Sequence, residues 1–308
     1  MMKIKNKNVL ITGANGFIGS YLVDKLNEKG YNVSILIKSI NSDRRYKEKN
    51  KIKIIIGDIK DKNLNLNSFN LIYHLAALTN MKECYDDPQK AFKENVEGTI
   101  NLITKMNPKC KFVYISTLGV YGEPKYFPVN EDHPTYPIEP YAASKLAAEN
   151  FIMGYCKSRK LNYCIARLFN VYGPKQNTEF LIPKIITQII RSNKIQLNNL
   201  DSTRDFIYID DVIEALYLIS EHGKNDIYNV GTGKETSVGE IIELLKKITH
   251  NNIKQEIFRK RGFKNSVRRS VADITKIEKD IGWHPSTNIN DGLIKTWGYY
   301  NGASRINR

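Results

Sequence analysis

The feature that most constrains the fold is a glycine-rich turn near the start of the chain. Residues 12–19 read Thr-Gly-Ala-Asn-Gly-Phe-Ile-Gly, between a predicted strand at Val9–Thr12 and a predicted helix at Ile18–Lys29. In such a unit the first glycine permits a tight turn, the second lets backbone N–H groups approach a pyrophosphate, and the third lets the helix pack on the sheet. The helix N-terminus then faces the phosphates with its positive dipole end. The expected cofactor contacts here are Gly13, Asn15, Gly16, Phe17, Ile18 and Gly19.

Short apolar runs alternate with amphipathic segments through the first half of the chain, which is typical of βαβ units. The prediction is an α/β fold with a Rossmann-type doubly wound parallel sheet and a smaller C-terminal α/β substrate domain. We expect residues 1–170 and about 205–230 in the dinucleotide-binding domain, and about 171–204 with 231–308 in the second. The other predicted strands are Val33–Ile37, Lys53–Ile56, Leu71–Leu75, Lys111–Ser116 and Tyr163–Leu168, and the helices are Pro88–Met106, Tyr141–Ser158, Phe180–Arg191 and Val212–Ser220.

Charge and cysteine content narrow the function classes. The 308 residues carry a formal net charge of +15, which favours anionic partners. The basic residues are spread along the chain without a nucleic-acid-binding motif, so they read as solvated surface or as contacts to a phosphorylated small molecule, and we expect no nucleic-acid partner. Four cysteines without a C-x-x-C pair indicate buried, reduced thiols. With no apolar run of ~20 residues and no signal-like segment at residues 1–8, we expect a cytoplasmic protein without a membrane partner.

The end of the second strand bears on the choice of cofactor. An NAD site usually has an acid there, whereas this chain reads Leu-Ile-Lys-Ser at residues 36–39, with Arg44 and Arg45 just after. Lys38 can pair with a 2′-phosphate, which favours NADP, or it is a surface lysine beside an NAD site that lacks the acid contact. Asp58, after the third strand, is placed to contact the adenine or is a simple turn residue.

The segment Tyr-Ala-Ala-Ser-Lys at residues 141–145 carries the catalytic hypothesis. Residues four apart share a helix face, so the Tyr141 hydroxyl and the Lys145 ammonium are expected to lie close together. A nearby positive charge favours phenolate and is expected to lower the tyrosine pKa from about 10. Tyr141 is then a usable base that takes a proton from an alcohol as hydride leaves for nicotinamide.

Together these motifs resemble the extended short-chain dehydrogenase/reductases, the NAD(P)-dependent nucleotide-sugar epimerase/dehydratase family. The resemblance covers essentially the whole chain. Besides residues 12–19 and 141–145 it rests on His-Leu-Ala-Ala at 74–77, Asn-Val-Glu-Gly-Thr at 95–99, residues 116–122, 167–174, 204–212 and 228–231, Ala272-Asp273 and Gly-Trp-His-Pro at 282–285.

The resemblance implies roles for individual residues. Tyr141 is the catalytic base, Lys145 holds the nicotinamide ribose, and Thr117 hydrogen-bonds the reacting sugar alcohol. Asn170 would bind the diphosphate region, and Arg204 and Arg268 would neutralise the phosphates; a turn cap and a solvated surface are the alternatives for Asn170 and Arg268. The remaining expected contacts are Ser116, Lys38, Asp58, Ile59, Leu75, Ala76 and Ala77 with the cofactor and Thr79 with the substrate.

Departures from the family pattern narrow the chemistry. Family 4,6-dehydratases carry an Asp-Glu pair directly after the position of Thr117, where this chain has Leu118 and Gly119, neither of which does acid–base work. The missing pair disfavours 4,6-dehydration, and the absence of a cysteine one residue beyond Thr117 disfavours epimerisation next to a ketone. A nucleotide-sugar 4-epimerase of carbohydrate biosynthesis is the main hypothesis, and a net 4-dehydrogenase or 4-ketoreductase is the alternative.

The remaining expectations concern the nucleotide base, the cofactor, the histidines and the oligomeric state. The stretch Ile195–Leu200 lacks the Gly-Asp-Gly that is usual in the family, and it is expected to shape the nucleotide pocket. The expected substrate is therefore a UDP-linked or a GDP-linked sugar, and the sequence does not distinguish the two bases. NAD is the family's usual cofactor, against the NADP suggested by Lys38. His74 is expected to be a packed structural histidine, and no metal site is expected because the remaining histidines form no cluster. The family resemblance implies a homodimer through the helices at 88–106 and 141–158.

Overall fold

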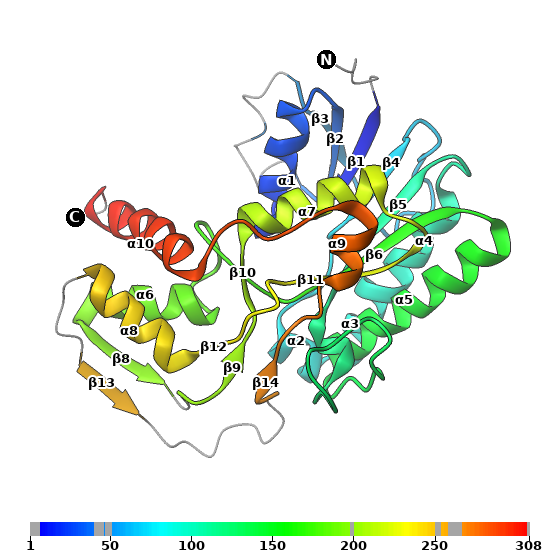
Figure 1. Cartoon of the computed structure of the whole chain (residues 1–308). Coiled ribbons are helices and arrows are strands. Elements are labelled where there is room, and N and C mark those ends of the chain that lie inside the picture. The colour runs from blue at the N-terminus through cyan, green and yellow to red at the C-terminus, as the bar shows by residue number, and fades with distance from the viewer. Residues whose placement is uncertain are drawn as a thin grey trace.

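The computed structural model describes residues 7–39, 46, 51–197, 200–249, 254–257 and 267–306. Its centre is a seven-stranded sheet in the order β11-β6-β5-β4-β1-β2-β3 (Figure 1). Every pairing in this sheet is parallel, which confirms the predicted doubly wound topology. The strands are β1 (Asn8–Thr12), β2 (Asn32–Ile37), β3 (Lys53–Ile56), β4 (Leu71–His74), β5 (Lys111–Thr117), β6 (Asn162–Leu168) and β11 (Asp226–Val230).

Helices cover both faces of the sheet, and β1 shows why its strands are apolar throughout. Val9 and Ile11 point into the core shared with α1 (Phe17–Glu28) and α7 (Ile209–His222). Leu10 points to the opposite core, under α4 (Gly98–Lys105) and α5 (Pro140–Arg159). Because alternate side chains leave a strand on opposite faces, a strand with two covered faces must be apolar at every position.

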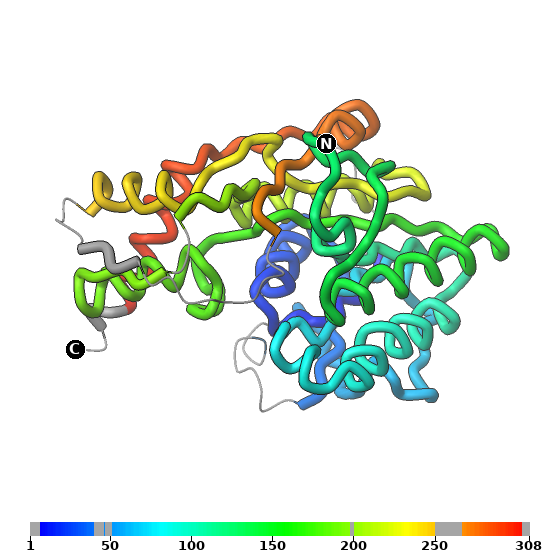
Figure 2. The backbone as a smooth tube through the Cα atoms, turned by 90° about the horizontal axis from the view of Figure 1, so that it is seen from below, coloured from blue at the N-terminus to red at the C-terminus, as the bar shows by residue number. Residues whose placement is uncertain are grey.

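The prediction of one regular helix at 88–106 is wrong, because a π-helical turn divides this segment. It consists of α3 (Pro88–Phe92), a π-helical turn η3 (Lys93–Glu97) and α4, and it runs beside α5 (Figure 2). Within the π turn, buried Asn95 reaches inward and bonds the backbone N–H of Leu78 at 2.7 Å and its carbonyl at 3.1 Å. A π turn holds an extra residue and so shifts which side chains face inward, a change that apolar periodicity does not reveal.

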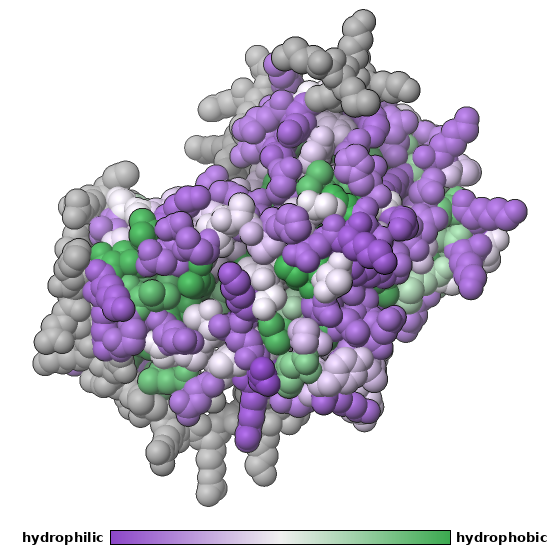
Figure 3. All heavy atoms as spheres, in the orientation of Figure 1, coloured by the Kyte–Doolittle hydropathy of each residue, from purple (hydrophilic) through white to green (hydrophobic). Residues whose placement is uncertain are grey.

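The C-terminal segments form smaller sheets and helices beside the large sheet (Figure 1). β7 (Asn170–Tyr172) pairs in parallel with β10 (Phe206–Tyr208), and β9 (Thr203–Arg204) lies between β12 (Thr236–Ser237) and β14 (Arg269–Ser270). Hydrophilic side chains dominate the face in Figure 3, with apolar ones gathered toward the side of α6 and α8. The other elements are α2 (Met81–Asp86), η4 (Leu118–Tyr121), α6 (Leu181–Ser192), β8 (Lys194–Leu197), α8 (Val238–Thr249), β13 (Lys254–Ile257), α9 (Thr275–Ile281) and α10 (Ile289–Ile306).

Two further sequence expectations concern the cysteines and membrane segments. Cys84, Cys110, Cys156 and Cys164 are all free and buried, as expected for structural thiols. In the parts of the chain that the structure describes, no helix is both long enough and apolar enough to cross a bilayer.

Candidate active site

The glycine turn lies at the point where the strand order of the sheet reverses. β1 and β4 are neighbours there, and the loops that follow them meet at their carboxyl ends, where open α/β sheets bind their ligands. Gly13 has φ of +72°, and a Cβ on it would lie 2.6 Å from the backbone nitrogen of Ala76. A Cβ on Gly19 would lie 2.2 Å from the Gly13 carbonyl oxygen. Both positions therefore require glycine, because backbone atoms occupy the space of a side chain.

The surroundings of this turn fit a dinucleotide. Gly16 precedes α1 without a side-chain cap, so the first N–H groups of the helix are left for an anion. Half-buried Leu75, Ala76 and Ala77 follow β4 opposite the turn. The Ser116 hydroxyl is buried and has no hydrogen-bond partner among the described residues, as expected of a group that a ligand satisfies. Asn15 lies in the turn itself, and Phe17 and Ile18 open α1, partly exposed.

His74 is a packed structural histidine, which confirms the prediction. Its Nδ1 lies 2.7 Å from the Thr12 hydroxyl and its Nε2 lies 2.9 Å from the Thr99 hydroxyl. Thr99 donates its own proton to the Asn95 carbonyl at 2.6 Å, so His74 is the donor at Nε2 and the acceptor at Nδ1. Burial, with a smaller effect of Lys145, lowers the pKa of His74 to about 3. The neutral ring ties the ends of β1 and β4 to α4.

Lys38 lies at the end of β2, as expected, but two carboxylates surround it. Its Nζ is 3.1 Å from Asp58, which follows β3, and 3.0 Å from Glu94 in η3. Glu94 also pairs with Lys60. The acid that the second strand lacks is thus replaced by acids from two other elements. Ile59, another expected cofactor contact, is buried beside Asp58.

Tyr141 and Lys145 lie one turn apart in α5, whose start is fixed by Glu139. The Glu139 carboxylate accepts a 3.0 Å bond from the Ala142 N–H, and Pro140 occupies the first turn of the helix. Lys145 is 2% exposed, and its Nζ lies 4.0 Å from the centroid of the Tyr114 ring on β5. Burial lowers the pKa of Lys145 to about 7, although Glu149 one turn further on opposes this shift.

The expected lowering of the Tyr141 pKa is wrong for the protein groups alone. Burial raises the pKa of Tyr141 above its ordinary value, and the negative charge of Glu139 and the nearby Cys84 raise it further. Residue spacing reveals only the lysine four residues away. It does not reveal the desolvation that the packing around the start of α5 imposes on both groups, which disfavours the charged form of each.

Thr117 ends β5 and brings a second hydroxyl to the start of α5. Its Oγ1 accepts a 3.2 Å bond from the Gly119 N–H in η4. A Cβ on Gly119 would lie 3.1 Å from the Cβ of Ala142, so η4 packs directly on the first turn of α5. Leu118 and Gly119, which separate Thr117 from the rest of η4, supply no ionisable group here.

Two of the expected diphosphate-binding residues, Arg204 and Asn170, bond backbone carbonyls through their side chains. Arg204 on β9 donates to the carbonyls of Thr203 at 2.7 Å and Arg268 at 3.0 Å, and it also bonds the Val267 carbonyl. Asn170 donates to the Asp205 carbonyl at 3.2 Å. Arg268 is exposed beside β14, and Thr79 is exposed just before α2. Arg204 thus helps to hold β9 beside β14, and the phosphate-binding roles of these residues stay predictions.

Two groups of residues near the site escaped the sequence analysis. Asn95 donates a 2.9 Å bond to the Ser144 hydroxyl, which in turn donates to the Tyr141 carbonyl at 2.7 Å, so η3 is tied to the turn of α5 that holds Tyr141 and Lys145. Glu149 continues the Tyr141–Lys145 face and pairs with Arg167 at 2.6 Å, both almost completely buried. The i, i+4, i+8 spacing of Tyr141, Lys145 and Glu149 was a usable signal for the carboxylate.

Some sequence hypotheses concern residues that the structure does not describe. Arg44 and Arg45, the Asn198–Asn199 part of the Ile195–Leu200 stretch, and His250 lie outside the described ranges. Within those ranges no group of three or more His, Cys, Asp or Glu residues is arranged to hold a metal ion.

A glycine turn at the switch point of a parallel sheet, with a Tyr and Lys one turn apart beside a threonine hydroxyl, defines the class of dinucleotide-dependent α/β enzymes. Comparison with known proteins narrows the class. The family model for GDP-mannose 4,6 dehydratase matches residues 10–296. The chain therefore belongs to the NAD(P)-dependent nucleotide-sugar epimerase/dehydratase family of extended short-chain dehydrogenase/reductases.

Relatives of both epimerase and dehydratase type resemble the chain. A UDP-glucose 4-epimerase of Mycolicibacterium smegmatis is 33% identical, with 96% of this chain and 99% of the relative covered. The human dTDP-D-glucose 4,6-dehydratase is 32% identical, with 96% and 90% covered. A Bacillus cereus UDP-glucuronic acid 4-epimerase, solved with UDP-glucuronic acid and NAD, is 28% identical and superposes with a TM-score of 0.86 over 96% of this chain and 99% of that one.

Proposed function

We propose that this protein is a nucleotide-sugar 4-epimerase that oxidises and re-reduces the C4 position of a nucleoside-diphosphate sugar. The observation that carries the proposal is the composition of the site. Thr117 and Tyr141 supply hydroxyls and Lys145 supplies a buried amine for alcohol–ketone chemistry, whereas Leu118 and Gly119 stand where a dehydratase needs an acid and a base. Loss of water from the sugar has no proton donor and acceptor at those positions.

Each residue has a defined task in this proposal. The bound nicotinamide would supply reversible hydride transfer at C4. Tyr141 takes the proton of the C4 hydroxyl, and Thr117 orients that hydroxyl by a hydrogen bond. Lys145 holds the nicotinamide ribose and, in its protonated form, supplies a positive charge that favours the phenolate of Tyr141. Once the ketone has rotated, return of the hydride to the opposite face of C4, together with return of the proton from Tyr141 to the C4 oxygen, would complete epimerisation without net redox change.

For the cofactor and substrate we infer NAD(H) and a UDP-linked sugar. The relative solved with NAD and UDP-glucuronic acid supports both inferences. The pairing of Lys38 with Asp58 and Glu94 supports NAD(H) further, because both carboxylates would repel a 2′-phosphate. We also propose that residues 1–170 and about 205–230 form the dinucleotide-binding domain and the remaining segments bind the sugar nucleotide. The placement of α7 and β11 on the large sheet supports this division.

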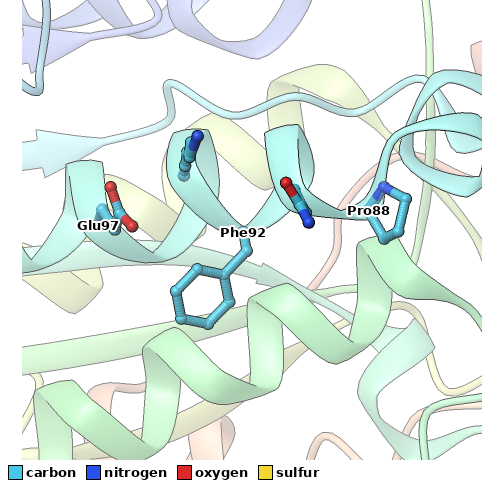
Figure 4. A pocket seen from close by; sticks show the side chains of 5 residues that line it. Pro88, Phe92 and Glu97 are labelled. Atoms are coloured by element: carbon cyan, nitrogen blue, oxygen red, sulfur yellow. The ribbon is translucent and has the colours of Figure 1, made fainter.

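We propose that the protein acts as a homodimer through α5 and the α3–η3–α4 stretch. An open groove lined by Pro88, Gln89, Phe92, Lys93 and Glu97 follows α3 and η3, and the Phe92 ring points toward α5 (Figure 4). Phe92 is 49% exposed, and exposed Met81 and Tyr85 lie on the neighbouring α2. Exposed apolar side chains of this kind mark an association surface.

The test is to incubate the purified protein with UDP-glucose or UDP-galactose and separate the products by chromatography, while the absorbance of reduced nicotinamide is followed. The proposal expects interconversion of the two sugars without net accumulation of NADH, and co-purification of bound NAD(H). GDP-linked sugars and UDP-glucuronic acid serve as parallel substrates, because the base and the sugar are inferred from relatives.

Two results would contradict the proposal. Stoichiometric accumulation or consumption of reduced cofactor, with a ketone or alcohol released, would identify a net 4-dehydrogenase or 4-ketoreductase. A 4-keto-6-deoxy product would show that other groups replace the missing Asp-Glu pair.

A further inference from the structure

A cluster of four charges lies where the ends of β2 and β3 meet η3. We call Lys38, Asp58, Lys60 and Glu94 the β2-edge cluster. Lys38 bridges Asp58 at 3.1 Å and Glu94 at 3.0 Å, and Glu94 also pairs with Lys60. Two cations and two anions therefore cancel within the cluster. It occupies the position where dinucleotide-binding folds meet the adenosine ribose.

Glu94 is the central member of this cluster. Its carboxylate pairs with the ammonium groups of both lysines, whereas Asp58 pairs with that of Lys38 and accepts a 2.9 Å bond from the backbone N–H of Lys60. The Glu94 side chain is 16% exposed, against 62% for Lys38 and 34% for Asp58. Although partial burial opposes ionisation, hydrogen bonds with Lys60 and Lys38 hold the pKa of Glu94 below its ordinary value. The carboxylate is thus charged at neutral pH. Without it, Lys60 would lose this partner and the cluster would carry a net charge of about +1.

The position of Glu94 is fixed by the π-helical turn. The next residue, Asn95, is buried and bonds both backbone groups of Leu78 and the Ser144 hydroxyl. These bonds hold η3 in place, and Glu94 faces across to the ends of β2 and β3. The acid is therefore part of a rigid element and not of a loose loop.

We propose that Glu94 is a specificity-determining residue that favours NAD over NADP. A 2′-phosphate brings about −1.5 to −2 charges to the ribose, and it would have to compete with Glu94 and Asp58 for Lys38 while being repelled by both acids. The neutral 2′-hydroxyl of NAD meets no such repulsion. The inference rests on the proposed use of NAD(H), but it does not depend on which sugar reaction the enzyme performs.

The experiment is a titration of the sugar-free protein with NADH and NADPH, followed by nicotinamide fluorescence. Glu94→Gln keeps the shape of the side chain, removes the carboxylate that pairs with Lys60, and leaves Lys38 with Asp58 as its remaining acidic partner in the cluster. We expect the affinity ratio of NADPH to NADH to rise about tenfold in this variant, and the rise to shrink at high salt. Glu83→Gln is the matched control, because it removes an exposed carboxylate that pairs with Lys90 at 2.6 Å on α2 and α3. It should leave the ratio unchanged.

A second variant keeps the test decisive if Glu94→Gln unfolds. Lys38→Gln leaves the cluster net negative, and we expect it to weaken NADPH binding further while NADH binding stays within about twofold. The proposal is overturned if the wild-type protein binds NADPH as tightly as NADH, or if the ratio stays constant in Glu94→Gln. Because no sugar is present, an absence of 4-epimerase activity would refute the proposed reaction without affecting this result.

Discussion

Tyr141 and Lys145 each have a pKa shifted against the charged form. Burial raises the pKa of Tyr141 and lowers that of Lys145 to about 7. The site without ligands therefore holds a neutral phenol beside a half-protonated amine. Tyr141 acts as a base only after its own proton has left, because only the phenolate can accept the proton of the substrate alcohol. The direction of both shifts follows from desolvation, which penalises an anion and a cation alike.

Removing the Tyr141 hydroxyl tests its role as the proton acceptor. Tyr141→Phe should lower kcat by about 10²–10⁴-fold, the usual contribution of a positioned acid–base group. NADH affinity should stay nearly constant, because the glycine turn is untouched. Turnover under saturating sugar nucleotide and nicotinamide fluorescence measure the two effects. Full activity in the variant would remove Tyr141 from the mechanism.

The low pKa of Lys145 also predicts a pH-dependent stability. Between pH 7 and about 10.5 the unfolded chain holds a proton on this lysine that the folded protein has lost, so the contribution of Lys145 to stability rises with pH. From pH 7 to pH 9 the rise from this group is about 2 kcal/mol. The Lys145→Met variant should lack this rise. The free energy of unfolding, measured with urea at pH 7 and pH 9, should therefore increase more in the wild type than in the variant. If the free energy of unfolding changed equally with pH in both proteins, or rose more in the variant, the burial of the Lys145 ammonium group would be contradicted.

At the scale of elements, the β1–turn–α1 unit depends on close backbone contact. A Cβ on Gly19 would lie 2.2 Å from the Gly13 carbonyl oxygen and 2.9 Å from the Ala14 Cα, and neither is the end of a flexible side chain. Gly154 in α5 has no atom within 4 Å of such a Cβ. The same chemical change therefore has opposite expected effects in two helices.

We expect Gly19→Ala to destabilise the protein by about 1–3 kcal/mol and to weaken dinucleotide binding, because α1 must move away from the turn. Gly154→Ala is the control and should stabilise the protein by about 0.5–1 kcal/mol, because alanine has a higher helix propensity than glycine and this position has room for a methyl group. Thermal unfolding and NADH titration of both variants measure these outcomes. A Gly19→Ala protein with unchanged stability and affinity would show that the helix has room to shift.

At the scale of the whole molecule, the proposed dimer surface is continuous with the elements that carry the site. α5 holds Tyr141 and Lys145, and η3 is tied to it through Asn95 and Ser144. Pairing of these helices between two copies would brace the catalytic turn from outside. Dimerisation and the order of the site are therefore expected to depend on the same surface.

Phe92→Glu places a charge in the groove and should shift the protein from dimer to monomer in sedimentation equilibrium at micromolar concentration. Phe180→Glu is the matched control, because Phe180 is 53% exposed at the start of α6, away from this surface. A wild-type protein that is monomeric, or a Phe92→Glu variant that stays dimeric, would exclude the proposed surface.

The βαβ alternation, the glycine turn and the shared helix face of Tyr141 and Lys145 are predictable from the residue pattern alone. Each of these rests on local spacing: a turn between adjacent elements, side-chain alternation along a strand, or residues one helical turn apart. Thus β1–β6 and α5 appear where the residue pattern predicts them.

Only the tertiary structure decided the π turn at Lys93–Glu97, the partners of Lys38 and the direction of the Tyr141 pKa. Glu94 meets Lys38 across 56 positions of the chain, and no local pattern encodes that meeting. Desolvation and Coulomb energies depend on what packs within a few ångströms, whatever its distance along the chain. Local spacing therefore predicts which residues form the candidate site, whereas their charge states depend on the packing of the whole fold.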